Sequence, residues 1–202
     1  DETFTGFKFM AEKLAEYKRD GSYNYLLGFE ESYGYMMGDY VRDKDAVTAS
    51  MMAAEMAAYY YDRGMTLIDA MDELYKKYGF YSEETVNLFM YGVDGLGEMR
   101  ALMASLRQTP PAEIGGTPVT RVRDYQTGDV VIPGLGVVEK TPIVGSNVLF
   151  FELSDGSALV VRPSGTEPKI KMYVLARGAG AEEARARKER YAAYARSLAE
   201  KK

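Results

Sequence analysis

The hydrophobic positions of the first half follow helical spacing, interrupted by one short apolar run. Residues 7–17 carry Phe7, Met10 and Leu14 on one helical face, which predicts a helix. The run Tyr23–Phe29 is short and mostly apolar, and therefore predicts a buried strand. A helix followed by a strand is the second half of a crossover unit, so we expect an α/β layer structure whose first strand is missing.

Two more helices are predicted before residue 80. Asp45 is the expected N-cap of a helix over residues 46–61, and its stripe of Met, Ala and Tyr is expected to pack inside the protein. Thr66 is the expected cap of a helix over residues 66–78 that Gly79 ends. Residues 80–93 are aromatic and predict a strand followed by a turn at Ser82-Glu83-Glu84.

In the second half the period changes from helical to alternating. Asp155-Gly156 between two apolar runs predicts a tight hairpin turn. The expected elements are a helix over 97–107, strands over 119–125, 147–153, 158–162 and 169–177, a long loop with a short extended piece over 126–144, and a helix over 181–201. Helices with several antiparallel strands indicate an α+β layer domain. We therefore predict an α/β domain over residues 1–93 and an α+β domain over residues 94–202.

Composition narrows the possible chemistry. The chain has 202 residues and a net charge of −5, which argues against nucleic acid or an anionic membrane as a general partner. It has no cysteine and no histidine, which removes thiolate chemistry, the commonest general base and the commonest metal ligand. With no signal peptide and no apolar run near 18 residues, the sequence predicts a soluble, cytoplasmic protein.

The segment from Arg162 to Lys169 reads Arg-Pro-Ser-Gly-Thr-Glu-Pro-Lys. Arginine offers a fork of donors to phosphate oxygens, Ser164 and Thr166 add hydroxyls, and Gly165 lets backbone amides turn toward an anion. The segment therefore favours a phosphate site. An ordinary surface turn between two strands is the alternative.

A second polar segment follows the first predicted strand. Glu30, Glu31 and Ser32 lie where the strand ends, which is the edge where α/β sheets bind ligands. Carboxylates and a hydroxyl suit the hydroxyls of a sugar ring. The alternative is that both glutamates are solvated charges paired with Arg42 or Lys44.

Three segments together resemble the α-D-phosphohexomutase family, most closely its phosphoglucomutase branch. They are Gly28-Phe29-Glu30-Glu31-Ser32, the segment from Val41 to Ala46, and the segment from Arg162 to Lys171. The resemblance implies part of a three-layer α/β third domain followed by a fourth domain that resembles the TATA-binding protein. It implies that Glu30 and Ser32 read hexose hydroxyls, that Arg42 and Lys44 line the cleft, and that Arg162, Ser164, Gly165 and Thr166 hold the non-reacting phosphate. Lys169 belongs to the same phosphate-binding segment, and Lys8 and Lys171 are weaker candidates for the same surface.

The family's phosphoserine and magnesium loops are missing from this sequence. We therefore expect a C-terminal portion of a phosphoglucomutase that interconverts glucose 1-phosphate and glucose 6-phosphate through glucose 1,6-bisphosphate, and that is inactive alone. Mg²⁺ would be bound by the missing part of the parent, and no catalytic or metal residue is expected here. A phosphomannomutase or phosphopentomutase portion, or a non-catalytic phosphosugar-binding module, remains possible, as does a homodimer through the uncovered sheet edge.

Overall fold

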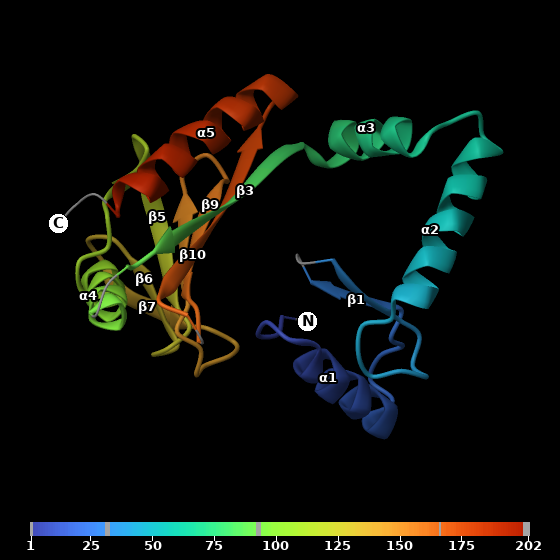
Figure 1. Ribbon diagram of the computed structural model, residues 1–202, viewed down its shortest axis with the longest axis horizontal. Helices are drawn as coiled ribbons and strands as arrows, with labels where there is room; N and C mark the ends of the chain where they lie inside the picture. Colours follow the sequence, from blue (N-terminus) through green and yellow to red (C-terminus); the bar gives the residue numbers. More distant parts are fainter. Residues whose placement is uncertain (1, 31–32, 92–93, 166, 200–202) are drawn as a thin grey trace. The chain divides into compact units, whose positions relative to one another are not determined.

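The chain forms two compact units in the computed structural model, residues Asp1–Leu74 and Tyr75–Lys202. The structure describes residues 2–30, 33–91, 94–165 and 167–199. Figure 1 shows the elements of both, coloured along the sequence.

The first unit consists of helices and one hairpin. Its elements are α1 (Phe7–Asp20), β1 (Leu27–Glu30), β2 (Gly34–Met37), α2 (Ala46–Tyr61) and most of α3 (Leu67–Tyr78). The predicted helices are confirmed. Asp45 caps α2 by accepting a hydrogen bond from Val47 N at 3.0 Å, and the Thr66 and Asp69 side chains bond each other's backbone N–H at the start of α3. Local polar residues therefore set where these helices begin.

The core of the first unit is small. Phe7 and Leu14 of α1 are buried against Met36 of β2, with Met10 and Tyr25 packed beside them. The remaining apolar residues of this unit are largely exposed.

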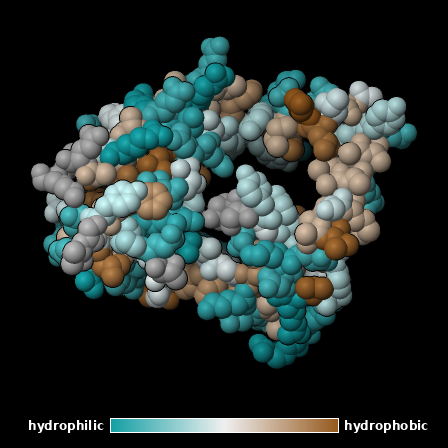
Figure 2. Space-filling view, viewed as in Figure 1, coloured by the Kyte–Doolittle hydropathy of each residue, from teal (hydrophilic) through white to brown (hydrophobic). Residues whose placement is uncertain are grey.

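Two expectations for the first unit are wrong. The run from Tyr23 is not a buried strand: only its end belongs to β1, which pairs antiparallel with β2, and Leu26 and Phe29 are 79% and 66% exposed. The stripe on α2 does not pack either, since none of its described residues is buried. Brown and tan side chains are accordingly visible along α2 in Figure 2. Among the described residues of the first unit, no further layer covers these surfaces.

The second unit is built on one antiparallel sheet in the order β3-β10-β9-β8-β5-β6-β7, and β4 pairs with β5. The strands are β3 (Phe80–Phe89), β4 (Glu113–Ile114), β5 (Thr117–Asp124), β6 (Asp129–Ile132), β7 (Gly136–Lys140), β8 (Leu149–Leu153), β9 (Ala158–Pro163) and β10 (Lys169–Gly178). The helices are α4 (Gly95–Gln108) and α5 (Ala181–Ser197).

Strict alternation along β10 gives the sheet two different faces. Ile170, Met172 and Val174 are fully buried, and they join a core to which α4 and α5 contribute (Figure 1). The residues between them, such as Lys171, are half-buried and point to the opposite face. One face of the sheet is therefore the core, and the other presents polar side chains at the Arg162–Lys169 loop.

Residues 126–144 and 80–93 differ from the sequence interpretation. Residues 126–144 contain the hairpin of β6 and β7 rather than a long loop. No turn interrupts β3, because it pairs with β10 along its whole length, from Phe80 to Phe89. This pairing places β3 in the second unit, so the division between the units falls before β3, whereas the sequence suggested a boundary at residue 93.

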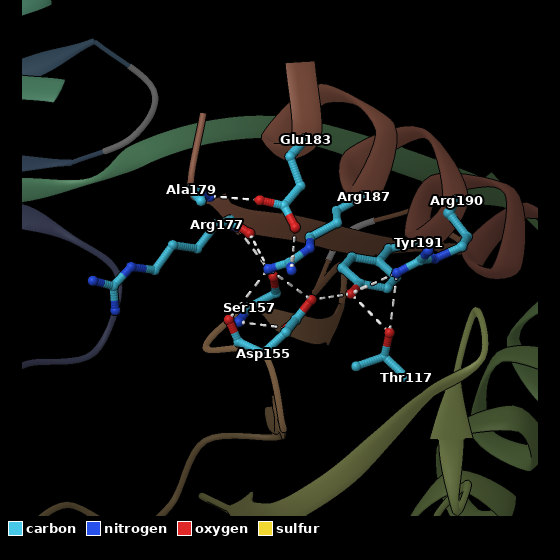
Figure 3. A network of polar contacts seen from close by, with 9 residues as sticks. All are labelled: Thr117, Asp155, Ser157, Arg177, Ala179, Glu183, Arg187, Arg190 and Tyr191. Carbon is cyan, nitrogen blue, oxygen red and sulfur yellow. Dashed lines mark hydrogen bonds and ion pairs between the residues drawn. The ribbon is translucent and has the colours of Figure 1, made fainter. Parts of the chain in front are cut away.

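A polar network ties α5 to the predicted hairpin turn (Figure 3). Tyr191 is fully buried; its hydroxyl donates to Asp155 and lies 2.9 Å from the Thr117 hydroxyl. Arg187 reaches Asp155 at 3.3 Å and donates to the backbone oxygen of Arg177 at 2.7 Å. Burial acts to raise the pKa of Asp155, but the hydrogen bonds from Tyr191 and Ser157, together with the Arg187 charge, outweigh it and hold that pKa below its usual value.

Among the described residues, none of the helices combines the length and the apolar character needed to cross a bilayer.

Candidate functional site

The Arg162–Lys169 loop is a compact connection between β9 and β10, as predicted. Ser164 N donates to Lys169 O at 2.8 Å, and Lys169 N donates to Glu167 O at 2.7 Å. Glu167 N donates to the Ser164 hydroxyl oxygen at 3.3 Å. These bonds connect the described residues on the two sides of the loop, and such pre-organisation lowers the entropic cost of binding a ligand.

Two cations face each other at the base of this loop. Arg162 of β9 and Lys171 of β10 are direct cross-strand partners, and both side chains are half-buried. Like charges directly opposite each other destabilise a strand pair. In the part of the chain that the structure describes, neither side chain has an ion pair. A bound anion would remove this repulsion, and the pair therefore favours an anion site over a plain turn.

The other residues of the Arg162–Lys169 loop give less support to a phosphate site than the sequence suggested. Lys169 pairs with Glu167 at 2.5 Å, so its charge is largely balanced inside the loop. Gly165 is exposed, has open space where a Cβ would lie, and does not adopt a left-handed backbone. The conformational reason for expecting a glycine there is therefore absent in this conformation. Thr166 lies outside the described residues.

One neighbour of the site gave no signal in the sequence. Asn87 of β3 is the cross-strand partner of Lys171 on the side away from Arg162. The three side chains form one row across adjacent strands. Only the register of a strand more than seventy residues earlier in the chain places Asn87 there.

In the first unit the structure brings Glu30 and Lys44 together. Lys44 Nζ lies 3.2 Å from Glu30 Oε1, and the glutamate side chain is only 11% exposed. A Cβ at Gly34 would lie 2.9 Å from Glu30 Oε1 and 2.6 Å from the Phe7 ring, so glycine is needed for this packing. Glu30 is therefore a fixed, half-buried carboxylate with a cation beside it, which suits a ligand that offers hydroxyl donors.

The remaining predicted residues of the first unit do not join this pair. Arg42 and Lys8 are exposed; the Lys8 ammonium lies 4.7 Å from the Phe9 ring centroid. Ser32 lies outside the described residues. Tyr33, which follows it, has a φ of 63° and is 89% exposed, a strained backbone for a residue with a side chain.

Asp45 anchors the segment that carries Lys44. Its carboxylate accepts hydrogen bonds from the hydroxyls of Tyr40 and Thr48, the second at 2.9 Å, and from Val47 N. The Tyr40 hydrogen bond is the largest of the effects that lower the pKa of Asp45, and in turn it raises the pKa of Tyr40. This carboxylate is occupied in fixing the turn before α2.

The described residues contain no group of three or more His, Cys, Asp or Glu side chains that could hold a metal ion.

Comparison with protein families gives two matches along the chain. Residues 1–78 match phosphoglucomutase/phosphomannomutase, alpha/beta/alpha domain III. Residues 115–193 match the phosphoglucomutase/phosphomannomutase C-terminal domain. The two matches together cover most of the chain, in the order expected from the sequence motifs.

Curated relatives and a solved structure agree with these matches. Phosphoglucomutases of Staphylococcus aureus strains RF122 and USA300 are 36% and 35% identical over 173 residues, which is 86% of this chain and 31% of those proteins. The chain thus spans about a third of their length. The open form of parafusin, a phosphoglucomutase from Paramecium, shares the fold with a TM-score of 0.63 at 20% identity, over 98% of this chain and 33% of that one. The chain belongs to the phosphoglucomutase/phosphomannomutase family, of which it carries the third and the C-terminal domain.

Proposed function

We propose that this chain supplies the sugar-reading and phosphate-holding part of a phosphoglucomutase that interconverts glucose 1-phosphate and glucose 6-phosphate. The observation that carries the proposal is the cross-strand pair Arg162 and Lys171 beside the Ser164 loop. Two adjacent cations without carboxylate partners among the described residues suit a dianionic phosphate. The names of the Staphylococcus relatives favour glucose as the sugar.

The two units have different tasks in this proposal. Arg162 and Lys171 hold the phosphate that is not reacting. Glu30 accepts hydrogen bonds from sugar hydroxyls, and the ion pair with Lys44 holds that carboxylate in place. Ser32 and Thr166 add hydroxyls to the two halves.

The reaction requires a sugar that is held equally well in two orientations. The bisphosphorylated intermediate, glucose 1,6-bisphosphate, reverses its orientation between two phosphoryl transfers. Each of its two phosphates is therefore, in turn, the one that does not react. A clamp on the remote phosphate contributes positioning, on which phosphoryl transfer depends. No step assigned to the described residues runs through a metal, although a magnesium ion bound elsewhere would neutralise charge on the moving group.

Two other substrates and one other role fit the same residues. The family matched here includes phosphomannomutases, and a pentose phosphate presents the same phosphate group. A non-catalytic phosphosugar-binding module would also use Arg162 and Lys171. These alternatives differ in sugar preference and in activity, not in phosphate binding.

Titration of the isotope-labelled chain with inorganic phosphate tests the site. We expect millimolar affinity, because a few hydrogen bonds must offset the entropy of association. Amide shifts should centre on residues 162–171. Arg162→Lys keeps the charge but loses the fork, and should weaken binding several-fold.

Arg185→Lys is the matched control, because Arg185 is an exposed arginine of α5 outside the site. It should leave phosphate affinity unchanged. Absence of shifts in the loop at tens of millimolar phosphate, or equal affinities for wild type and Arg162→Lys, would refute the proposed site.

A coupled assay tests the activity expected of the chain by itself. With Mg²⁺ and glucose 1,6-bisphosphate present, the purified chain should form no glucose 6-phosphate from glucose 1-phosphate. Activity that scales with the amount of purified chain would show that the phosphoryl donor is among its own residues.

A further inference from the structure

Two exposed aromatic rings stand next to the Arg162–Lys169 loop. Phe89, the last residue of β3, is 47% exposed, and Tyr91 just beyond it is 82% exposed. Their ring centroids lie 5.9 Å apart with an interplanar angle of 20°, so the two rings are stacked. We call this pair the aromatic shelf. It is a flat apolar surface that already exists without a ligand.

The shelf is fixed to the loop by the strand pairing. Phe89 is the cross-strand partner of Lys169, whose ammonium lies 5.6 Å from the Phe89 ring centroid. Between the two rings, Met90 is buried and its N–H donates to Pro168 O at 2.8 Å. The rings therefore keep their position relative to the loop.

The outward-facing positions of β3 change from polar to aromatic side chains toward the Arg162–Lys169 loop. Thr85 and Asn87 are polar, and the next outward positions are the two rings of the shelf. An exposed aromatic pair at the end of the strand nearest the cations is not needed for the core, because the buried positions of this strand are the alternate ones, Val86, Leu88 and Met90.

We propose that the aromatic shelf contacts the apolar carbon–hydrogen face of the hexose ring of a phosphosugar whose phosphate is held by Arg162 and Lys171. The proposal rests on the phosphate site proposed above. Asn87 opposes Lys171, so Phe89 is the diagonal neighbour of Lys171, and such positions lie about 7–8 Å apart across a sheet. A sugar ring with its phosphate ester bridges a separation of that size.

Aromatic rings suit this ligand because a hexose has polar edges and apolar faces. A ring surface contacts the face without competing for the hydroxyls, which stay available to acceptors and water. The shelf then distinguishes a phosphosugar from inorganic phosphate, since both bind the cations but only the phosphosugar reaches the rings.

The test compares two ligands on the full chain and its variants. Phe89→Leu combined with Tyr91→Ala removes both rings and keeps an apolar side chain beside the loop. We expect the affinity for glucose 6-phosphate to fall about three- to tenfold, as for the loss of a good aromatic contact. The affinity for inorganic phosphate should stay the same. Both constants come from titrations followed by amide shifts, whose unperturbed signals elsewhere verify the fold.

Tyr81→Ala is the matched control. Tyr81 is 44% exposed on the same strand and lies 5.8 Å from the Arg177 guanidinium, but it is eight residues from Phe89, about 27 Å along the strand. Its removal should change neither affinity.

The outcomes separate this inference from the function on which it rests. If the wild type binds neither ligand, the phosphate site and the shelf are both refuted. If the wild type binds phosphate and the double variant loses affinity for both ligands equally, the rings only support the loop and the inference is wrong. If the double variant binds both ligands as tightly as the wild type does, the rings do not contact the sugar, and the inference is wrong as well.

Discussion

The first unit is no poorer in apolar residues than the second, but only the second buries its apolar faces. In the second unit, α4 and α5 contribute to the core on one face of the sheet, and Phe151, Met172 and Tyr191 are fully buried. In the first unit the buried cluster consists of Phe7, Leu14 and Met36. Hydrophobic periodicity thus identified helices in both units, but a covered face also requires a second layer.

The contrast is sharpest on the helices. Tyr191 of α5 is fully buried, whereas α3, which has a well-defined apolar face, leaves Ile68 and Met71 75% and 49% exposed. Exposed apolar surface of this kind is typical of a site that contacts another protein surface. The following predictions test how far the two units differ.

Hydrogen exchange should give the largest difference. Opening free energies within one protein range from about 0 to the global value, which is roughly 5–15 kcal/mol. Amides of residues 23–29 should therefore exchange orders of magnitude faster than those of 147–153 and 169–177. Equal protection would mean that a partner or a second copy covers the first unit, as in the homodimer considered from the sequence.

Removal of a large core side chain should affect only the second unit strongly. Phe151 is fully buried, so Phe151→Ala should lower the free energy of unfolding of this unit by about 3–5 kcal/mol. Denaturant unfolding followed by amide signals of β10 measures the effect. Leu14→Ala, in the small cluster, is the comparison and should leave the β10 transition unchanged. A shift of that transition by Leu14→Ala would show that the units unfold together.

Loss of one hydroxyl in the α5 network should have an intermediate effect. Tyr191→Phe leaves the Asp155 carboxylate and the Thr117 hydroxyl without this partner, at a cost of about 1–3 kcal/mol. The same denaturation experiment measures it. Because the folded pKa of Asp155 is depressed, the stabilisation is present above its ordinary value of 3.8 and is lost as the pH falls through the folded pKa. The difference between wild type and variant should therefore shrink in acid.

The smallest effect is expected at the cap of α2 in the first unit. The folded pKa of Asp45 is also depressed, so its contribution is present above the ordinary pKa and fades as the pH falls through the folded one. Helix signals of α2 should weaken in acid in the wild type. Asp45→Asn caps without titrating and should remove this dependence. A dependence that persists in Asp45→Asn would assign it to another carboxylate.

Signals that lie close together in the sequence predicted most elements correctly. The turn at Asp155-Gly156, the cap at Asp45 and the stop at Gly79 each depend on residues within one turn of the chain. The loop after Arg162 was recognised in the same way. Its residue types and spacing are local, and so the loop that carries the proposed phosphate site could be recognised from the sequence.

Features that depend on distant pairing were missed. The segment Ser82-Glu83-Glu84 looks like a turn, yet it is strand because β10 pairs with it and because Glu84 finds Lys188 at 3.3 Å on α5. The hairpin of β6 and β7 is a local feature, and it was missed for another reason: the Gly, Pro and Val residues of this segment follow no clear period. Asn87 and the aromatic shelf reach the site only through the register of β3. The pairing of β3 with β10 therefore cannot be predicted from a short window of sequence.

The repulsion between Arg162 and Lys171 links the stability of the second unit to the salt in which it is kept. A ligand that binds only the folded state stabilises it by mass action, by about 1.4 kcal/mol when its concentration is tenfold above the dissociation constant. For a millimolar site, an ordinary phosphate buffer reaches that range, whereas chloride at equal ionic strength offers no comparable fork of acceptors. The melting temperature should therefore be higher in the phosphate buffer than in the chloride buffer. This difference reports whether the site binds phosphate.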